Sequence, residues 1–510
     1  MNSWRKAFVL MTSLAAVVAA SLTWYPRTYD AREPSRLAFA EHCAGCHGKE
    51  LKGTDSGPPL INVELVHGDT TTQLISSITR HAQLTSGAMD NQLILPSHAI
   101  KALALYVSER RQHLPTIPES QVYRLPDEPI SSQHHEFRVE HVTDLTSAPY
   151  SMAPLPAGDI LVTEKVRGLS LIDQGGRQSP LIKNTPPVWE EMLKLRGSYV
   201  GLGMLLDVEL HPDYDNNGWI YLSHTDRCQL DCRSLVPQTM VRVVRGKIND
   251  GSWHSQEIIW SVDRDFYTVI PDNVAAGRLA FDDEGHLFIT IGGKASYSQL
   301  HELDTPYGKI HRVNDDGSVP EDNPFWQPPG ERARPSTRHT VWSFGHRTAQ
   351  GLSAHPVHGA IWASEMGPRG GDEINRIVPG GNYGWPLYTE GLDYDGRPVT
   401  IGEELGLDFS LAATIPPAVD FTPAPSLSSF TFHRGQLFPD WDNDLLVGSL
   451  RARTLFRVRI KDDQPVEREK LLEHLGRIRD VEMGPKGSVY LLIEHQDGGS
   501  LLRLIPTAQQ

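Results

Sequence analysis

The chain of 510 residues has few cysteines and a shortage of positive charge. It contains four cysteines, and its 48 lysine and arginine residues are outnumbered by 63 aspartate and glutamate residues, which gives a net charge of −15. An acidic chain without a basic stripe is poorly suited to bind nucleic acid or an anionic membrane surface. The charge balance therefore excludes nucleic acid from the expected partners.

Glycine and proline are abundant, at 43 and 37 residues. Because these residues form turns and end strands, the composition favours a turn-rich, mostly β protein over a helical bundle. The length predicts two to four domains, since domains commonly contain about 100–200 residues.

The N-terminus carries the pattern of an export segment. Arg5 and Lys6 precede an uncharged run over residues 7–24, and Val18-Ala19-Ala20 offers small residues for cleavage. This run is close to the shortest that spans a bilayer. Residues 1–24 are therefore a signal peptide or an N-terminal membrane anchor, and we expect a periplasmic or otherwise exported protein, either free or anchored to the inner membrane.

The cysteines separate into two pairs. Cys43-Ala44-Gly45-Cys46-His47 matches C-x-x-C-H, the motif of c-type haem attachment, in which two thiols bond the haem and the histidine ligates the iron. A redox dithiol or a zinc half-site is the alternative. Cys228 and Cys232 lie in a polar loop, and two spare cysteines in an exported chain predict a disulfide more readily than a metal site.

The surroundings of the haem motif resemble a small class I cytochrome c, which would occupy residues 31–114. A helix is expected over Pro34 to Glu41 and a last one over Ser97 to Arg111, followed by a linker over 115–134. In the last helix, apolar residues recur at helical spacing, namely Ile100, Leu103, Ala104 and Val107.

The sixth iron ligand is expected between the motif and this last helix. Met89 is the candidate, because a thioether favours reduced iron, although Asp90 stands where such cytochromes usually have proline. The alternatives are His67, His81 and His98.

From residue 135 a pattern recurs of an apolar strand, a turn with Gly, Asp or Asn, and a second apolar strand. Six such units begin at residues 151, 205, 277, 351, 428 and 479. Repetition of this kind is typical of a propeller, which removes open sheet edges by radial repetition. The expected fold is a small all-α cytochrome c domain followed by an all-β six-bladed β-propeller over 135–510; two fused β-sandwiches are the alternative.

The loops between these strands carry specific motifs: VWSFGHRTAQGL (341–352), ASEMGPRGGDEINRIVPGGNYGWP (363–386), GSLRARTLFR (448–457) and LGRIRDVEMGPKG (475–487). Through them the chain resembles, over 135–508, the soluble aldose and glucose/sorbosone dehydrogenases that use pyrroloquinoline quinone (PQQ). The resemblance implies oxidation of an aldose or other alcohol at a PQQ and calcium site. The tethered cytochrome would then take the electrons, since tethering gives effective concentrations of about millimolar.

The resemblance also assigns residues to this site. It implies that PQQ is contacted by Arg347, Gln350, Arg451, Arg477 and Arg479. Arg451 replaces a lysine of relatives, and the planar guanidinium suits the carboxylates of PQQ. Arg477 and Arg479 alternate, so they would face one side of a strand. Ordinary surface ion pairs are the alternative role for these arginines.

The expected calcium site is the turn Gly367-Pro368, whose backbone carbonyls would hold the ion together with PQQ. Asp372 and Glu373 would bind a second, structural calcium ion, or they would cap turns.

The substrate side departs from the family. The base histidine of relatives is Val274 here, and three other polar positions are Thr348, Leu202 and Gly293. Arg347 remains as a catalytic residue, and Asp272 is the nearest titratable group that could replace the base.

Two functions remain open. The first is a quinohaemoprotein dehydrogenase with haem c, PQQ and calcium, a sugar or alcohol substrate, and an electron acceptor such as another cytochrome, a quinone or an oxidase. The second is a catalytically altered propeller that acts as a docking module on an electron-transfer cytochrome. A calcium-dependent lactonase or esterase is a weaker third class, because it leaves the haem unexplained.

Overall fold

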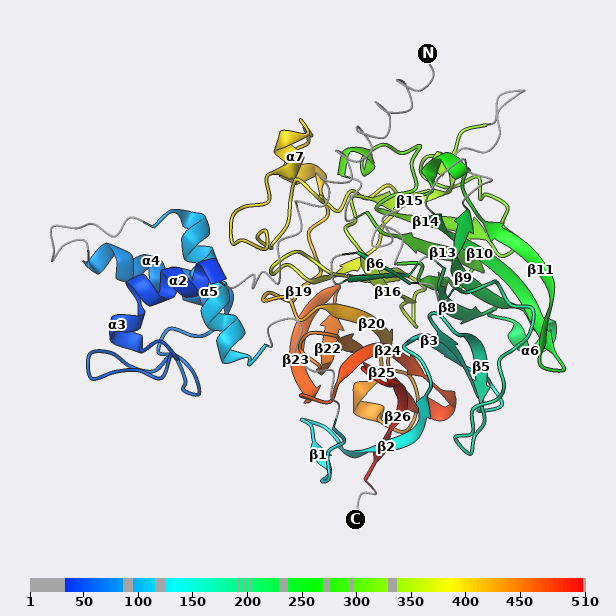
Figure 1. The fold of residues 1–510 in the computed structure, drawn as a ribbon, viewed down its shortest axis with the longest axis horizontal. Coiled ribbons are helices and arrows are strands. Elements are labelled where there is room, and N and C mark those ends of the chain that lie inside the picture. The colour runs from blue at the N-terminus through cyan, green and yellow to red at the C-terminus, as the bar shows by residue number, and fades with distance from the viewer. Residues whose placement is uncertain are drawn as a thin grey trace, which may run out of the picture.

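The computed structural model describes residues 33–85, 95–114, 124–189, 192–195, 198–201, 203–228, 237–268, 276–293, 297–328 and 337–507. Helices fill the first part of the chain and the rest is mostly sheet, and Figure 1 shows the N-terminal helices grouped at one side of the sheets. Within the described residues, no helix is both long enough and apolar enough to cross a membrane.

The N-terminal part contains the helices α2 (Glu33–His42), α3 (Ala44–His47), α4 (Thr71–Thr85) and α5 (Ser97–Arg111). The two helices expected on either side of the haem motif are thus confirmed. Helix α5 packs Leu103, Ala104 and Val107 into a core with Phe39 of α2 and Leu74 of α4. Its periodicity therefore identified the face that points into the cytochrome.

The described strands after residue 130 form six sheets of three to five strands and one two-stranded hairpin. Each sheet is antiparallel, and in five of the six the strands follow one another in the chain as in a propeller blade. Blade 1 contains β3 (Pro149–Pro154), β4 (Ile160–Glu164) and β5 (Gly168–Ile172); blade 2 contains β8 (Leu205–Leu210), β9 (Ile220–Cys228), β10 (Gln238–Asn249) and β11 (Ser252–Trp260). Blade 3 contains β12 (Leu279–Phe281), β13 (His286–Ile291), β14 (Lys309–Asn314) and β15 (Val341–Phe344).

Blade 4 contains β16 (Ala349–Ala354), β17 (Ile361–Glu365), β18 (Glu373–Arg376) and β19 (Val419–Asp420); blade 5 contains β20 (Leu427–Phe432), β21 (Leu445–Ser449), β22 (Leu455–Lys461) and β23 (Gln464–Leu472). Blade 6 contains β24 (Arg477–Met483), β25 (Val489–His495) and β26 (Gly498–Pro506), to which β2 (Glu136–Leu145) and β1 (Ile130–Ser131) are added. The hairpin is β6 (Met192–Leu195) with β7 (Ser198–Gly201), and α6 (Tyr214–Asn217) and α7 (Ile401–Glu404) are short helices between strands.

The first strands of the blades form a closed ring. β3, β8, β12, β16, β20 and β24 each contact the next, and β24 contacts β3 again. These are the strands that open the six repeated units of the sequence, so the predicted six-bladed propeller is confirmed. The ring is closed by β2, which pairs with β26 and so joins both ends of the propeller in one blade.

One buried arginine connects five of these six strands. Arg278, directly before β12, is 4% exposed, and its guanidinium bonds Asp207 of β8 at 3.1 Å and Asp480 of β24 at 2.8 Å. It also donates to three backbone carbonyls, those of Gln350 in β16 at 2.9 Å, Tyr150 in β3 at 3.2 Å and Arg479 in β24 at 3.2 Å. The positive charge thus compensates two buried carboxylates in the centre of the ring.

The helical part rests on the propeller through α5 and the residues after it. Ala102 and Leu105, on a second face of α5, pack with Leu392 of a propeller loop. Leu114 lies in the apolar core shared by blades 4 and 5, beside Trp362 and Phe430. The two parts of the described chain therefore share apolar packing as well as a covalent connection.

Replacing Arg278 tests this central connection. We expect Arg278→Met to lower the free energy of unfolding of the propeller by about 3–5 kcal/mol, because it leaves Asp207 and Asp480 buried without a cation. Chemical unfolding followed by tryptophan fluorescence measures the change. Arg177→Met, on an arginine side chain that is 87% exposed, is the matched control and should have little effect. Equal losses in the two variants would contradict the assignment.

Candidate active site and haem attachment site

The C-x-x-C-H motif forms a short helical turn directly after α2. The amides of Cys46 and His47 donate hydrogen bonds to the carbonyl oxygen of Cys43, at 3.2 and 3.0 Å, and both thiols are free. Nδ1 of His47 donates to the carbonyl oxygen of Pro58 at 2.8 Å. A ligand histidine is commonly oriented in this way, and Nε2 is left for the iron.

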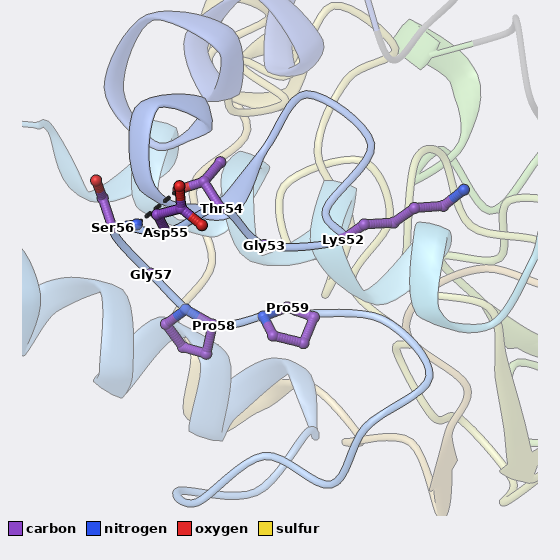
Figure 2. A pocket seen from close by; sticks show the side chains of 8 residues that line it. All are labelled: Lys52, Gly53, Thr54, Asp55, Ser56, Gly57, Pro58 and Pro59. Atoms are coloured by element: carbon purple, nitrogen blue, oxygen red, sulfur yellow. Dashed lines mark hydrogen bonds between the residues drawn. The ribbon is translucent and has the colours of Figure 1, made fainter.

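A shallow, open hollow follows the loop that Figure 2 shows, and residues 52–59 line it. Oγ1 of Thr54 donates to the carbonyl oxygen of Cys46 at 2.6 Å and so holds the loop against the motif. A Cβ atom on Gly57 would lie 2.8 Å from Cβ of Cys46, so this close approach requires glycine. The free thiols and the oriented histidine fit a covalently bound haem.

The thiol chemistry separates haem attachment from a redox dithiol. Burial and the neighbouring Cys46 raise the pKa of Cys43 to about 11. Redox-active C-x-x-C pairs have lowered thiol pKa values instead. The environment of Cys43 therefore favours haem attachment over the redox alternative.

The sixth ligand of the iron stays a prediction. Met89 and Asp90 lie outside the described residues. Among the alternatives, His67 and His81 are exposed and His98 is half-buried.

In the propeller, Arg347 lies between β15 and β16 and is 6% exposed. Its amide donates to Oε2 of Glu365 at 2.9 Å, and its side chain bonds the carbonyl oxygen of Met366 at 2.8 Å and the hydroxyl of Tyr394 at 3.1 Å. The guanidinium also lies 5.2 Å from the ring centre of Trp385. Two separate loops, which contain Met366 and Tyr394, thus hold this arginine.

Arg477 and Arg479 of β24 meet around one carboxylate. Nε of Arg479 bonds Oε2 of Glu494 in β25 at 2.8 Å, and Nε of Arg477 lies 3.9 Å from the other oxygen. Lys165, after β4, bonds Glu494 at 2.9 Å. Within the described part of the chain, the three cations of this cluster therefore outnumber its one carboxylate. The predicted placement of both arginines on one side of a strand agrees with this arrangement.

The pKa values in this cluster follow its charges. Burial, with Arg479 nearby, lowers the pKa of Lys165 to about 8. Burial alone would raise the pKa of Glu494, but Arg479, Lys165 and Arg477 together hold it well below its ordinary range. Glu494 is therefore the ionised carboxylate of this cluster, and the surrounding lysine and arginines carry more positive charge than it offsets. Such an excess of positive charge suits a ligand with several carboxylates.

Two of the expected PQQ arginines also have donors without an acceptor. Nε of Arg347 and Nε of Arg477 are buried and have no hydrogen-bond partner among the described residues. The same is true of Nε in Arg110, Arg242 and Arg312, which are not among the expected PQQ residues, so this feature alone does not single out a ligand site. The fit to an anionic cofactor rests on the excess of positive charge around Glu494 among the described residues.

Arg451 and Gln350 are placed differently. Arg451 bonds Oε1 of Glu109, in helix α5, at 3.1 Å, and it also donates to the carbonyl oxygen of Ala424 at 3.2 Å. Gln350 is 6% exposed, and its backbone carbonyl accepts from Arg278. Arg451 thus engages the cytochrome, whereas Arg347, Arg477 and Arg479 lie within the propeller.

A second candidate position, for a cation, lies next to Arg347. A cavity of about 20 Å³, large enough for one ion or water, is lined by Glu365, Glu373 and the glycines 367 and 371. Nδ2 of Asn375 donates to Glu373 at 2.9 Å, while its Oδ1 is buried without a partner among the described residues. Burial and the charge of Glu365 raise the pKa of Glu373 to about 8. The carboxylates of Glu365 and Glu373 are the kind of oxygen ligand that calcium takes, and Arg347 lines the same cavity.

The residues expected to bind calcium therefore fall into two groups, those that line the cavity and those that do not. Gly367 and Glu373 line the cavity, whereas Pro368 is buried beside it. Asp372 accepts the amides of Gly367 at 2.9 Å and Leu427 at 2.8 Å, which is the turn-stabilising role left open for it. Sequence reasoning did not single out Glu365, which also lines the cavity, although it belongs to the quoted loop motif.

The substrate-side departures lie only partly within the described residues. Asp272, Val274 and Leu202 lie outside them. Thr348 donates its hydroxyl to the carbonyl oxygen of Arg347 at 2.7 Å. A Cβ on Gly293 would lie 2.7 Å from Cα of Gly308, so the fold excludes an acidic side chain there.

The imidazole nearest to Arg347 in sequence does not replace the missing base. Nδ1 of His346 bonds Glu365, and Nε2 bonds the hydroxyl of Ser343 at 2.8 Å. Both ring nitrogens are therefore used within the fold. Elsewhere, Cys228 is disulfide-bonded, and its expected partner Cys232 lies outside the described residues.

Comparisons with known proteins agree with this architecture. The family described as Glucose / Sorbosone dehydrogenase matches residues 146–503, and the family described as Cytochrome c matches residues 33–109. The chain therefore belongs to the glucose/sorbosone dehydrogenase family and carries a cytochrome c domain at its N-terminal side.

Individual relatives are sugar dehydrogenases. The chain is 32% identical over 372 residues to aldose sugar dehydrogenase YliI of Escherichia coli (strain K12), which covers 72% of this chain and 92% of that protein. It is 25% identical over 445 residues to quinoprotein glucose dehydrogenase B of Acinetobacter calcoaceticus, covering 73% and 88%. The crystal structure of the soluble aldose sugar dehydrogenase from Escherichia coli in the apo-form matches with a TM-score of 0.63 and 30% identity, covering 73% and 100%. A sugar dehydrogenase propeller combined with a cytochrome c domain supports an oxidoreductase that acts on sugars and uses haem.

Two glycines near the haem motif allow a matched test. We expect Gly57→Ala to lower the yield of covalently bound haem several-fold, because its Cβ would overlap Cys46, and such overpacking costs about 1–3 kcal/mol. Gly45→Ala, within the motif itself, is the control, because nothing lies within 4 Å of its added Cβ. The pyridine haemochrome spectrum of the purified proteins measures the yield. Full haem content in Gly57→Ala would contradict the proposed role of this loop.

Proposed function

We propose that this protein is an exported quinohaemoprotein dehydrogenase. It oxidises an aldose or another alcohol at a PQQ and calcium site in the propeller and passes the electrons to its own c-type haem. The observation that carries the proposal is the excess of positive charge around Glu494, where Lys165, Arg477 and Arg479 share one carboxylate among the described residues. The name of the quinoprotein relative supports a quinone cofactor in this family.

The chain would hold PQQ through its arginines. Arg477 and Arg479 would bind carboxylates of PQQ with the charge that Glu494 leaves uncompensated, and Arg347 would bind the reacting side. The cavity between Glu365 and Glu373 would hold a calcium ion beside Arg347. When bound, PQQ supplies an ortho-quinone that accepts a hydride, and calcium supplies a Lewis acid.

A base must take the proton of the substrate hydroxyl when its carbon loses the hydride. Asp272 is our proposal for this role, because Val274 cannot accept a proton and His346 is engaged on both nitrogens.

Each substrate molecule releases two electrons, and the haem held by Cys43, Cys46 and His47 would carry them singly to an external acceptor. That acceptor would be another cytochrome, a quinone or an oxidase, reached from the periplasm with or without a tether through residues 7–24.

The experiment uses the purified holocytochrome with PQQ and calcium, and it offers aldoses, polyols and simple alcohols while haem absorbance is recorded. We expect one substrate class to reduce the haem only when PQQ and calcium are both present. Arg477→Met should weaken PQQ binding about tenfold or more, because one charge-assisted contact is lost. Arg177→Met is the control for the loss of an exposed arginine.

Asp272→Asn should lower turnover by about 100-fold or more if Asp272 is the base. Unchanged turnover in Asp272→Asn would exclude it from that role. If PQQ binds but no substrate reduces the haem, the propeller is a docking module on an electron-transfer cytochrome. Hydrolysis of a lactone without haem reduction would instead favour the lactonase class.

A further inference from the structure

Two propeller loops that hold Arg347 also pair with each other. Arg369 in the first loop (366–372) and Leu392 in the second (389–397) exchange backbone hydrogen bonds of 2.9 and 2.8 Å. Arg347 bonds the carbonyl oxygen of Met366 in the first loop and the hydroxyl of Tyr394 in the second. The position of this guanidinium therefore depends on both loops, which we name the paired loops.

The cytochrome rests on the same paired loops. Ala102 and Leu105 of α5 pack against Leu392. Gly396 also approaches α5, because a Cβ there would lie 3.5 Å from Cβ of Ala102. At the edge of the contact, Nζ of Lys101 lies 3.9 Å from Glu390.

Glu109 of α5 provides the charge at the centre of this contact. Its side chain is 1% exposed, and its carboxylate bonds Arg369 at 3.3 Å and Arg451 at 3.1 Å. Arg369 also donates to the hydroxyl of Ser35, in α2, at 2.8 Å, and Ser35 is itself 2% exposed. Without the charge of Glu109, Arg369 and Arg451 would lose the carboxylate that they share.

We propose that docking of the cytochrome through Glu109 positions Arg347, so that the haem domain is a structural part of the dehydrogenase site as well as its electron acceptor. Glu109 is then a positioning residue that acts through Arg369, the paired loops and Tyr394. The kinetic part of this inference rests on the proposed function, whereas the structural part does not.

The structural test is hydrogen–deuterium exchange on the full-length haem-loaded protein without added cofactor or sugar. We expect Glu109→Gln, which keeps the side-chain shape and removes the charge, to raise exchange in 366–372 and 389–397 about tenfold or more. Exchange in blade 2 should be unchanged. Glu50→Gln is the matched control, because Glu50 forms an exposed ion pair with Arg110 in the same domain, at 2.9 Å. Unchanged exchange in the paired loops of Glu109→Gln would overturn the proposal.

The kinetic test separates positioning from electron transfer. Sugar oxidation is measured with PQQ and calcium, using a soluble acceptor that takes electrons without the haem. Glu109→Gln should lower this turnover several-fold or weaken PQQ binding to a similar extent, while Glu50→Gln should not. Loss of haem reduction alone, with normal turnover to the soluble acceptor, would show that Glu109 serves only electron transfer and would overturn the positioning role.

Tyr394→Phe provides a second variant in case Glu109→Gln does not fold. It removes the hydroxyl that bonds Arg347 and leaves Glu109 with both arginines. We expect weaker PQQ binding, several-fold, with exchange in α5 unchanged; normal PQQ binding would contradict the proposal. If the parent protein oxidises no sugar, the proposed function fails, but the exchange experiment still decides whether Glu109 orders the paired loops.

Discussion

The arrangement of this molecule depends on one buried carboxylate, Glu109, held between Arg369 and Arg451. A carboxylate is buried at acceptable free energy only when cations and hydrogen bonds compensate it, and here both cations come from the other domain. The pairing therefore requires the cytochrome and the propeller to dock in one way. It brings the domain that carries Cys43, Cys46 and His47 against the loops that hold Arg347, which a flexible linker alone would not achieve.

Within the propeller, two groups of charged side chains differ in their balance of charge. Arg278 compensates two carboxylates at the centre of the ring and joins five blades, whereas the cations around Glu494 exceed their carboxylate partner. In the first group, one arginine bonds two carboxylates, so the charges balance to within one unit, and this near balance suits a structural role. The second retains an excess of positive charge among the described residues, which suits an anionic ligand. The difference separates the structural arginine from the ones that we assign to the cofactor.

The sequence predicted those features of the fold and site that depend on residues close to one another in the chain. Strand repeats predicted six blades, the C-x-x-C-H spacing predicted the haem site, and alternation placed Arg477 and Arg479 on one side of β24. Helical spacing in the sequence identified only the face of α5 that points into the cytochrome. It could not identify the second face, with Ala102, Leu105 and Glu109, because this face contacts residues 260 to 342 positions away in the chain. For the same reason the partner of Arg451 and the grouping of Glu365 and Glu373 around one cavity required the structure. The sixth iron ligand and the base remain predictions, since Met89 and Asp272 lie outside the described residues.

The most direct test of the central claim, electron transfer inside one docked chain, is the dependence of the haem-reduction rate on protein concentration. The protein loaded with PQQ and calcium is mixed rapidly with saturating sugar over a hundredfold range of protein concentration. Docked domains predict a first-order rate that does not change across this range. A rate that rises in proportion to protein concentration would contradict the account, because electrons would then pass between separate molecules.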